Sequence, residues 1–593
     1  MNNSTKILSR KDFITILVVL SVIIILWRCF TLQYTESKKY SGLLENNVIK
    51  ERIILTNRGS IVDRNNNILA ESLQMDALII NDTEKFYKNK NNIIKMCNLL
   101  NITYKSLVKQ TDGKENKKYI RIKRYLDSEV VNEIKKLNLS GLYFEKEMQR
   151  FYPEGEVLAP LIGKTNNNHE GQMGLELSFD ELLSEENGIK IVKQDGNGKI
   201  VKEIRLVKQP KEGKNLELTI DIRLQYVAYR ELKKQVNKVN AKAGSVVILD
   251  SINGDILAIA NYPSYDPNLP GSYSDEKAKN RAIIESIEPA STIKPFVLAA
   301  GLHSKKISLF NSKYDTSAGL RVGNYSITDW KNLGDGLTAE DVVVYSSNIG
   351  SVKMAQSFDK KIYYNLLEYV GIGEKIDINF PAEQDGQLNH YSGWDKTKLA
   401  THAYGYGLKT TPLQLAKAYA VIANEGQVIN PRIIKNKNFN EDKTKKYENS
   451  FNKVKDVLKK VVTKGGGRKA SVEGYSVGGK TGTARAYTDG NYTKEHISIF
   501  SGMTPIEKTK LIIVVVINEP RTEQYFGSEV AAPVFKKIAT DSLRILNVSP
   551  DNILDFQEKV SIEIENSKKY TFKNPEVRNV FWIKRYVWAK SWY

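Results

Sequence analysis

Cysteine is almost absent from this sequence, since its 593 residues contain only two, Cys29 and Cys97. Two thiols cannot build a disulfide framework, so packing has to stabilise the fold. Acidic residues are also scarce, with 68 Asp and Glu against 88 Lys and Arg, which leaves a formal net charge of +20. This surplus favours anionic partners such as nucleic acid, lipid headgroups or an acidic cell wall, and the charge alone does not choose among them.

Low-complexity tracts and repeats of fixed period are missing as well. With 41% hydrophobic and 26% charged residues, the composition is that of a globular protein, which excludes collagen-like and wholly disordered chains. The length predicts roughly four domain-sized units.

One apolar stretch, Phe13–Trp27, follows Lys6, Arg10 and Lys11 and ends at Arg28. Its fifteen residues give about 22 Å of helix, which spans a bilayer of about 30 Å only if Arg28 snorkels to the interface. A cleaved signal peptide and a buried core helix are alternatives, although bulky residues after Trp27 do not form a cleavage site. We predict an uncleaved anchor.

The boundaries of this anchor follow from the same pattern. We expect a cytoplasmic tail at 1–12 and a transmembrane helix at 13–33. The positive residues before the helix keep the N-terminus in the cytoplasm, so everything after residue 34 lies outside. We therefore expect a protein that crosses the cell membrane once. That placement argues against nucleic acid as a partner, as does the lack of a basic stripe with interleaved aromatics.

Residues 34–215 are lysine-rich and irregular, with short strand-like runs such as 77–80. Clusters of Asn, Lys and Asp at 82–92 and 111–118 predict loops. Residues 546–593 form a polar tail that becomes aromatic and basic near its end, which suits a membrane interface, a partner groove or docking on its own domain.

Between 216 and 545, strands precede and follow a helix-rich stretch, which predicts an α+β domain with antiparallel strands of one sheet. Asn253-Gly254 is the strongest hairpin signal in the chain. The expected elements are strands at 216–220, 244–250, 255–260, 497–500 and 511–517, and a helix at 223–236.

Ser291 and Lys294 lie in the sequence Glu288-Pro-Ala-Ser-Thr-Ile-Lys. Pro-Ala-Ser before an apolar run predicts the start of a helix, which places the two side chains one turn apart on one face. A serine hydroxyl needs a base to become a nucleophile, and a lysine whose pKa is lowered by burial and a nearby cation can be that base. Ser-x-x-Lys alone also occurs by chance on exposed helices.

A second motif is Ser346-Ser347-Asn348. A hydroxyl two positions before a carboxamide can face one cleft from a loop, so that Ser346 shuttles a proton while Asn348 holds a peptide group. Ser-Ser-Asn is also a common turn.

The third motif runs Gly478-Gly-Lys-Thr-Gly-Thr483. An extended segment of this kind can bind a peptide as an added strand, and Gly482 leaves room for close backbone approach. Lys480, Thr481 and Thr483 suit a carboxylate. Residues 474–481 also fit a phosphate loop, but no buried strand precedes them and no amphipathic helix follows.

Together the three motifs, in this order and separated by 55 and 134 residues, are the signature of penicillin-binding proteins and class A β-lactamases. The chain resembles a class B penicillin-binding protein over nearly its whole length beyond the anchor. The triplet ending in Asn348 is more similar to division-type than to elongation-type members. One departure is Ala290, where the family commonly has glycine. Further similar motifs occur at 58–65, 150–153, 174–176, 404–407, 411–414 and 530–533.

This resemblance implies an extended pedestal or dimerisation domain at 34–215 and a transpeptidase domain at 216–545, with a central antiparallel sheet, flanking helices and an all-helical part. It implies a serine D,D-transpeptidase that crosslinks peptidoglycan stem peptides, binds β-lactams and works beside membrane glycosyltransferase or division proteins. It implies no cofactor and no metal.

The roles that the resemblance implies are as follows. Ser291 is the nucleophile, Lys294 its base, Lys480 the cation that keeps Lys294 neutral, and Ser346 the proton carrier to the leaving group. Substrate binding falls to Asn348, Thr481, Gly482 and Thr483, and the backbone N–H groups of Ser291 and Thr483 form the oxyanion hole.

Two alternatives remain open. A β-lactamase-like hydrolase would need a base for water, and the Glu-x-x-Leu-Asn stretch of the class A enzymes is missing. A non-catalytic division scaffold would not need the three motifs. A bifunctional glycosyltransferase would need a further catalytic domain.

His402, His496 and Asp489 could approach one another, but their spacing is no ligand signature, and we predict no metal site.

Overall fold

A computed structural model describes residues 10–36, 49–112, 119–194, 200–435, 444–488 and 490–552. The predicted tail at 546–593 therefore lies outside the described residues from 553 onward. The chain divides into two compact units, each made of separate stretches. The first unit comprises residues 1–59, 72–150 and 182–214, and the second comprises 60–71, 151–181 and 215–593.

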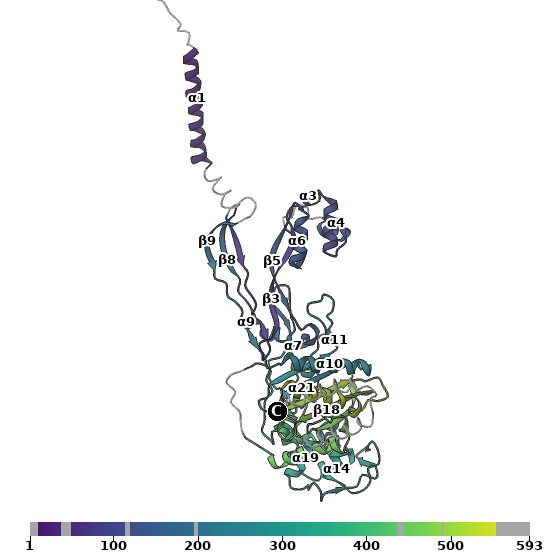
Figure 1. The fold of residues 1–593 in the computed structure, drawn as a ribbon. Coiled ribbons are helices and arrows are strands. Elements are labelled where there is room, and N and C mark those ends of the chain that lie inside the picture. Colours follow the sequence, from purple (N-terminus) through teal and green to yellow (C-terminus); the bar gives the residue numbers. More distant parts are fainter. Residues whose placement is uncertain are drawn as a thin grey trace, which may run out of the picture. The chain divides into compact units, whose positions relative to one another are not determined.

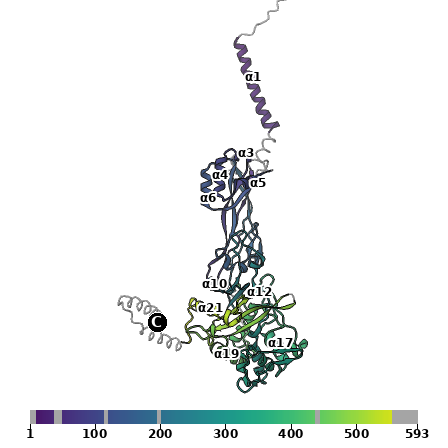
Figure 2. The ribbon, with the colours of Figure 1, turned by 90° about the vertical axis from the view of Figure 1, so that its right-hand side faces the viewer.

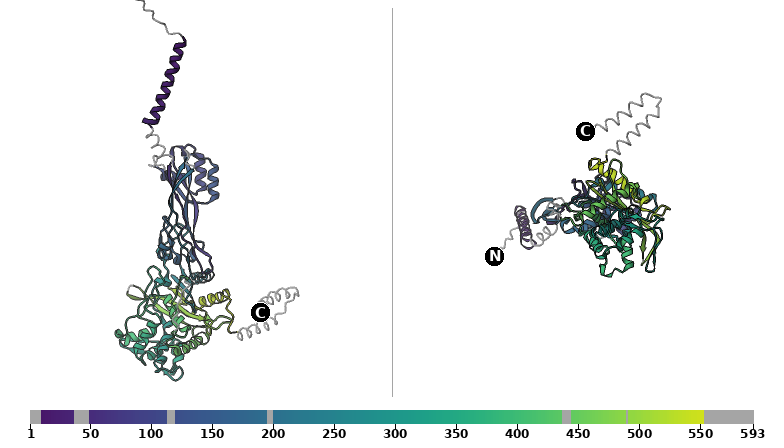
Figure 3. Two further views of the ribbon diagram at one scale, coloured as in Figure 1. Left: turned by 90° about the vertical axis from the view of Figure 1, so that its left-hand side faces the viewer. Right: turned by 90° about the horizontal axis from the view of Figure 1, so that it is seen from below.

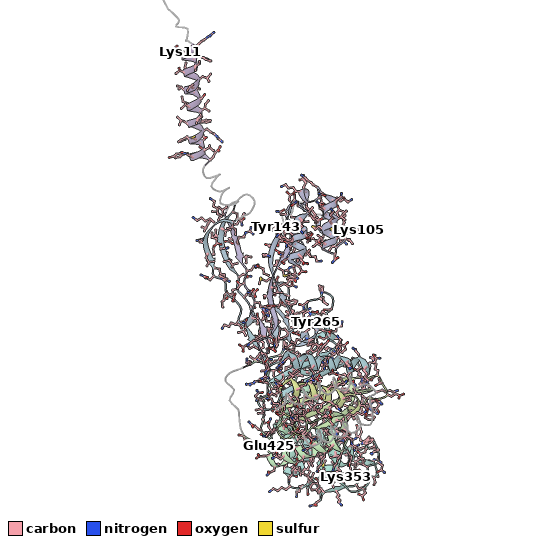
Figure 4. The ribbon with its side chains drawn as sticks, in the orientation of Figure 1. Lys11, Lys105, Tyr143, Tyr265, Lys353 and Glu425 are labelled. Atoms are coloured by element: carbon pink, nitrogen blue, oxygen red, sulfur yellow. The ribbon has the colours of Figure 1, made fainter. Side chains whose placement is uncertain are left out.

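The apolar N-terminal segment forms α1 (Arg10–Phe30), which continues as a π-helical turn, η1 (Thr31–Thr35). Its 21 α-helical residues span about 32 Å, enough for a bilayer core of about 30 Å. None of its side chains is buried, and they point outward on all sides, with Lys11 in the first turn (Figure 4). By length and composition this is one helix that could cross a membrane, as predicted.

The first unit contains two groups of strands and a small helical cluster. A three-stranded antiparallel sheet has the order β1-β8-β9, while the later part of β3 pairs with β4 and β5. Besides α1, η1 and α9 (Asp180–Leu183), the elements are β1 (Ile49–Ile54), β3 (Ile68–Ile80), α3 (Thr83–Phe86), α4 (Lys90–Leu99), α5 (Tyr104–Thr111), β4 (Ile120–Leu126), α6 (Ser128–Lys136), β5 (Leu142–Phe151), β8 (Gly188–Gln194) and β9 (Ile200–Lys208).

The predicted loop at 82–92 is wrong, because this stretch contains α3 and the start of α4. The Asp82 and Asn89 side chains each accept a hydrogen bond from a backbone N–H of the following turn. These polar residues are therefore helix N-caps, and the same residue types favour turns in the absence of a helix. Residues 113–118 of the second predicted loop lie outside the described residues.

The second unit is built around a five-stranded antiparallel sheet with the order β12-β11-β19-β18-β17. Strands from before and after the helix-rich stretch thus share one sheet, which confirms the predicted α+β fold. The strands are β11 (Ala243–Asp250), β12 (Ile256–Tyr262), β17 (Gly478–Thr488), β18 (Asn491–Thr504) and β19 (Leu511–Asn518).

Helices cover both faces of this sheet (Figures 1 and 2). On one face, α10 (Ile222–Lys238) and α21 (Ala532–Ile545) pack on the strands around buried Leu232, Val515 and Phe535. On the other face lie α18 (Pro412–Ala423) and α19 (Glu448–Thr463), with the rest of the helical part beyond them (Figure 3). The other helices of the second unit are α11 (Asp275–Ala278), α12 (Arg281–Ile284), η3 (Ala290–Ile293), α13 (Lys294–His303), α14 (Ala339–Val344), α15 (Asn348–Gln356), α16 (Lys360–Tyr369), η4 (Tyr391–Gly393) and α17 (Lys396–Ala403). The short elements η5 (Arg468–Ala470) and α20 (Gly527–Val530) pack with α21 instead.

Short elements complete the second unit, among them β10, which is shorter than the predicted strand at 216–220 and pairs in parallel with β2. They are β2 (Ile61–Val62), η2 (Gly155–Val157), α7 (Ala159–Ile162), β6 (Lys164–Thr165), β7 (Gly171–Met173), α8 (Gly174–Ser178), β10 (Leu216–Glu217), β13 (Lys313–Tyr314), β14 (Leu320–Val322), β15 (Tyr325–Ile327) and β16 (Leu337–Thr338).

The central helix α18 supplies a test of how this fold is stabilised, since all twelve of its residues are buried. Thr411 caps it: the Thr411 Oγ1 accepts from Gln414 N at 3.1 Å, and the Gln414 side chain accepts from Thr411 N at 2.8 Å. Replacing Thr411 by Ala removes the cap and is expected to lower the free energy of unfolding by about 1 kcal/mol. Urea unfolding measures this loss. The exposed Thr540→Ala serves as control and should change the value by less than about 0.5 kcal/mol.

Candidate active site

Ser291 lies in a tight turn directly before α13. Residues 290–293 form the 3-10 turn η3, and α13 begins at Lys294, so the predicted helix starts with a 3-10 turn. Side chains at i and i+3 eclipse in this geometry, which places Ser291 and Lys294 on the same side. Ser291 is half-buried and Lys294 is completely buried.

Ala290, the residue before the nucleophile candidate, has a φ of 49°, in the left-handed region. This conformation costs an alanine about 1 kcal/mol, and glycine would adopt it freely. The neighbouring loop holds the turn in place: Ala290 N donates to Gly405 O at 3.1 Å. A side chain at Gly405 would start 2.0 Å from Ala290 O, so this position requires glycine.

The ammonium group of Lys294 points toward the second motif. Its Nζ lies 2.7 Å from Ser346 O, 2.8 Å from the Asn348 Oδ1 and 3.3 Å from the Ser346 Oγ. The two short bonds go to carbonyl oxygens, which only accept, whereas the hydroxyl can accept or donate. A neutral amine can therefore satisfy both carbonyls with its two N–H bonds and keep its lone pair for a proton.

Lys480 approaches the same hydroxyl from the sheet. It lies on β17, the edge strand predicted for this motif, and its Nζ donates to the Ser346 Oγ at 2.9 Å and to Thr481 O at 3.1 Å. The Ser346 hydroxyl thus lies between two lysines that are far apart in the sequence. Its residue has a φ of 64°, so the loop backbone is in the left-handed region here too.

Burial lowers the pKa of both lysines, and like charge adds to this for Lys294. Desolvation is the main cause of the lowered pKa of Lys294, the Lys480 charge adds to it, and the carboxylate of Asp329 opposes it. Desolvation lowers the pKa of Lys480 to about 7. Because two adjacent ammonium groups repel each other in a site that excludes water, one proton between the two amines is the favoured state.

The predicted substrate-binding residues line the same place. The Asn348 Nδ2 donates to Thr328 O at 3.0 Å, and the Thr481 Oγ1 lies 3.4 Å from the Lys480 Nζ. The Thr483 Oγ1 accepts from Gly527 N at 3.0 Å, which leaves its own proton available. A side chain on Gly482 would lie 3.0 Å from the Thr292 side chain and 3.1 Å from Pro289 O, so the glycine lets β17 approach the turn.

The hydrogen-bond network around the Ser346 hydroxyl does not reach Ser291. Within the described residues its hydroxyl makes no hydrogen bond, and the contacts of Lys294 go to Ser346 and Asn348. The hydroxyl on this half-buried turn is therefore not held by another side chain.

Asp329 is a site residue that sequence reasoning missed. Its carboxylate accepts from the Ser347 Oγ at 2.6 Å, Asn348 N at 2.5 Å and Ile349 N at 3.2 Å. These bonds cap α15 and fix the loop that carries Ser346 and Asn348. A cap from 19 residues upstream has no local sequence pattern, so only the folded chain reveals it.

The two histidines considered for a metal have other contacts. The His402 Nδ1 lies 2.9 Å from Tyr406 O and the ring packs on Trp394, while His496 stacks on Tyr525 at 3.9 Å. Asp489 lies outside the described residues. In the described part of the chain, no three His, Cys, Asp or Glu side chains converge as metal ligands.

The site combines a buried lysine beside a serine turn, a hydroxyl shared with a second lysine, and an edge strand, β17, that pairs on one side only among the described strands. This combination is typical of serine acyl-transfer enzymes that bind peptides along a strand. Comparison with known families agrees. Residues 244–540 match the penicillin-binding protein transpeptidase domain, and residues 53–218 match the penicillin-binding protein dimerisation domain.

Relatives of this class are similar over most of their length. The Neisseria meningitidis protein named "Probable peptidoglycan D,D-transpeptidase PenA" is 36% identical over 87% of this chain and 90% of its own. Peptidoglycan D,D-transpeptidase FtsI of Escherichia coli strain K12 is 33% identical, over 84% and 85%. A crystal structure of a peptidoglycan synthetase from Bifidobacterium adolescentis shares the fold, with a TM-score of 0.63 at 23% identity over 85% of this chain and 98% of that one.

The chain belongs to the class B penicillin-binding proteins and is an enzyme with a serine transpeptidase domain. The resemblance drawn from the sequence is confirmed, and the similarity to FtsI supports the division type.

Asp329 provides a test of how the site is held together. Replacing Asp329 by Ala removes three hydrogen bonds at the start of α15 and frees the loop of Ser346. Loss of charge-assisted bonds worth about 1.5–3 kcal/mol is expected to slow acylation by a fluorescent penicillin roughly 10- to 100-fold. Stopped-flow labelling measures the rate. The exposed Asp335→Ala is the matched control, and an equal effect of both variants would contradict a positioning role for Asp329.

Proposed function

We propose that this protein crosslinks peptidoglycan as a D,D-transpeptidase that forms an acyl-enzyme on Ser291. The observation that carries the proposal is the chain of contacts from Lys294 through the Ser346 hydroxyl to Lys480 in one buried place. Such a chain can take a proton from an attacking serine and deliver it to a leaving amine.

The terminal carboxylate of a D-Ala-D-Ala stem peptide would bind Lys480, with Thr481 and Thr483 as hydroxyl donors. The peptide would lie along β17, whose outer edge has no partner strand within the described residues. Asn348 would orient the acyl part. A bound carboxylate raises the pKa of Lys480, so Lys480 holds the shared proton and Lys294 stays neutral.

In the first step, the Ser291 Oγ attacks the carbonyl carbon of the penultimate D-alanine while its proton passes to Lys294. The backbone N–H groups of Ser291 and Thr483 stabilise the oxyanion. The C–N bond then breaks, and the proton reaches the departing D-alanine through Ser346. An amine of a second stem peptide then attacks the ester carbonyl carbon, and the C–O bond to Ser291 breaks. The proton lost by the amine returns to the Ser291 Oγ by the reverse route, which frees the enzyme and leaves the crosslink, of the 4,3 type. β-Lactams acylate Ser291 by the same first step.

We further propose that α1 spans the cell membrane once, with Lys6, Arg10 and Lys11 inside and the chain after residue 34 outside. The parts at 34–215 and 216–545 would act as pedestal and catalytic domain. The similarity to FtsI favours a role at the division septum beside a membrane glycosyltransferase and other division proteins.

Ser291→Ala tests the nucleophile. The wild-type protein should form a stable covalent adduct with a fluorescent penicillin, and the variant should form none, because no other hydroxyl replaces the nucleophile. Gel fluorescence measures the adduct, with the exposed Ser308→Ala as control. An adduct that turns over rapidly would instead indicate a β-lactamase, and no adduct in the wild type would indicate a non-catalytic scaffold.

The pH dependence of acylation tests the base. Lys294 must be neutral to accept the Ser291 proton, so the second-order rate should rise as the pH passes the lowered pKa of Lys294, well below 10.5. At higher pH, loss of the Lys480 proton weakens carboxylate binding, and the rate should fall again. The rising and falling limbs of this pH–rate profile report the coupled pair of Lys294 and Lys480, and neither limb reports one lysine alone. A rate that is constant from acid to neutral pH and rises only near pH 10.5 would contradict Lys294 as the base.

A further inference from the structure

The outer strand of the three-stranded sheet in the first unit, β9, is exposed along its entire length. Five of its nine residues are large and apolar, which is unusual for a strand that no other element covers in the part of the chain that the structure describes. They are Ile200, Val201, Ile204, Leu206 and Val207, with side chains between 44% and 65% exposed.

The pairing of β9 with β8 is interrupted by three bulges at a regular interval. Successive β8 residues pair with Lys208, Leu206, Arg205, Glu203, Lys202 and Ile200, so that Val201, Ile204 and Val207 have no partner. Each unpaired residue is β-branched and is followed by a cation. An apolar–basic pair therefore recurs at every third position, about 10 Å apart along the edge.

The register also places cations on one face of this sheet. Lys193 of β8 pairs with Lys202 on one side and Ile49 on the other, and Ile191 pairs with Arg205. Within the described residues, Lys193, Lys202 and Arg205 form no ion pair. The strands β1, β8 and β9 together carry seven Lys or Arg and two Glu, a surplus of five positive charges.

The chain itself keeps this sheet near a membrane. The helix that could cross the bilayer ends at Thr35, and β1 begins at Ile49. The thirteen residues between them extend to about 45 Å at most, so the start of β1 stays within that distance of the end of the helix in any arrangement of the parts. Such a tether gives a weak surface contact a high effective concentration.

We propose that the edge of β9 binds the anionic surface of the membrane that α1 crosses. Val201, Ile204 and Val207 enter the headgroup region, while Lys202 and Arg205 bind lipid phosphates. Apolar residues interleaved with cations are the composition of interfacial membrane-binding segments, and clustered Lys and Arg near a span bind anionic lipid.

The bulges argue against a second copy of the chain as the occupant. Strand addition at an exposed edge needs a regular row of N–H and C=O groups, and bulges and lysines are devices that prevent it. A partner membrane protein would be recognised by the same apolar residues, but the repeated cations favour a surface of repeated negative charge.

The test uses the full-length protein reconstituted in vesicles, with an NBD fluorophore on Ile204→Cys in a Cys29→Ser background, since Cys97 is buried. In vesicles of phosphatidylcholine mixed with phosphatidylglycerol, we expect a blue shift of the NBD emission and quenching by bromolipids. In phosphatidylcholine alone, or at high salt, both effects should be lost. The matched control is Val108→Cys, a similarly exposed apolar residue of the first unit, which should remain in water in all vesicles.

A second variant tests the role of the positive charges on β9, and penicillin acylation shows whether that variant still folds. Lys202→Glu with Arg205→Glu should abolish the lipid dependence of the NBD signal while penicillin acylation continues at the wild-type rate. An Ile204 probe that stays in water in anionic vesicles overturns the proposal. A blue shift in detergent that grows with protein concentration, or only after addition of a membrane partner, overturns it in favour of a second copy or of that partner. Because acylation is measured separately, failure here leaves the transpeptidase assignment unaffected.

Discussion

The catalytic unit is organised around one constraint, which is that two lysine amines that would repel each other when charged are buried in the same site. Lys294 and Lys480 are both buried and both reach the Ser346 hydroxyl. Placing like charges together without water is unfavourable, and the arrangement is tolerable because one amine can give up its proton. Under the mechanism proposed above, two chemically identical residues would take opposite roles, Lys294 as the neutral base and Lys480 as the cation.

Each part of this arrangement comes from a different kind of element. The 3-10 turn before α13 carries Ser291 and presents Lys294 behind it, the capped start of α15 carries Ser346 and Asn348, and an edge strand carries Lys480. Turn and strand meet where Gly482 lies against Pro289 and Thr292. Buried helix α18 supports the turn through a hydrogen bond from the Tyr419 hydroxyl to Thr292 O at 2.9 Å. The rigid core of the unit thus ends directly at the reacting groups.

Much of this could be predicted from the sequence. The apolar strand runs, the Asn253-Gly254 hairpin and the apolar helix at the N-terminus are local patterns, and the three motifs identify a family because their order is rare by chance. The spacing of Ser291 and Lys294 is also local, and it holds even though the first turn is 3-10 and the alanine before it adopts a left-handed conformation.

Contacts between distant residues could not be predicted. Asp329 caps a helix that begins 19 residues later, and Gly405 is needed because of the Ala290 carbonyl. The polar residues at 82–92 favour turns and helix caps equally, and the choice depends on the apolar residues that α4 buries. The bulges of β9 depend on how its residues pair with those of β8, and the sequence of β9 alone does not determine this pairing.

The lowered pKa values of both lysines have a consequence beyond the reaction itself. If the catalytic part lies outside the membrane, as proposed above, no cytosolic buffer surrounds it, and the fraction of molecules with a neutral Lys294 would follow the acidity of the medium. Acylation would then slow in an acidic medium without any dedicated sensor.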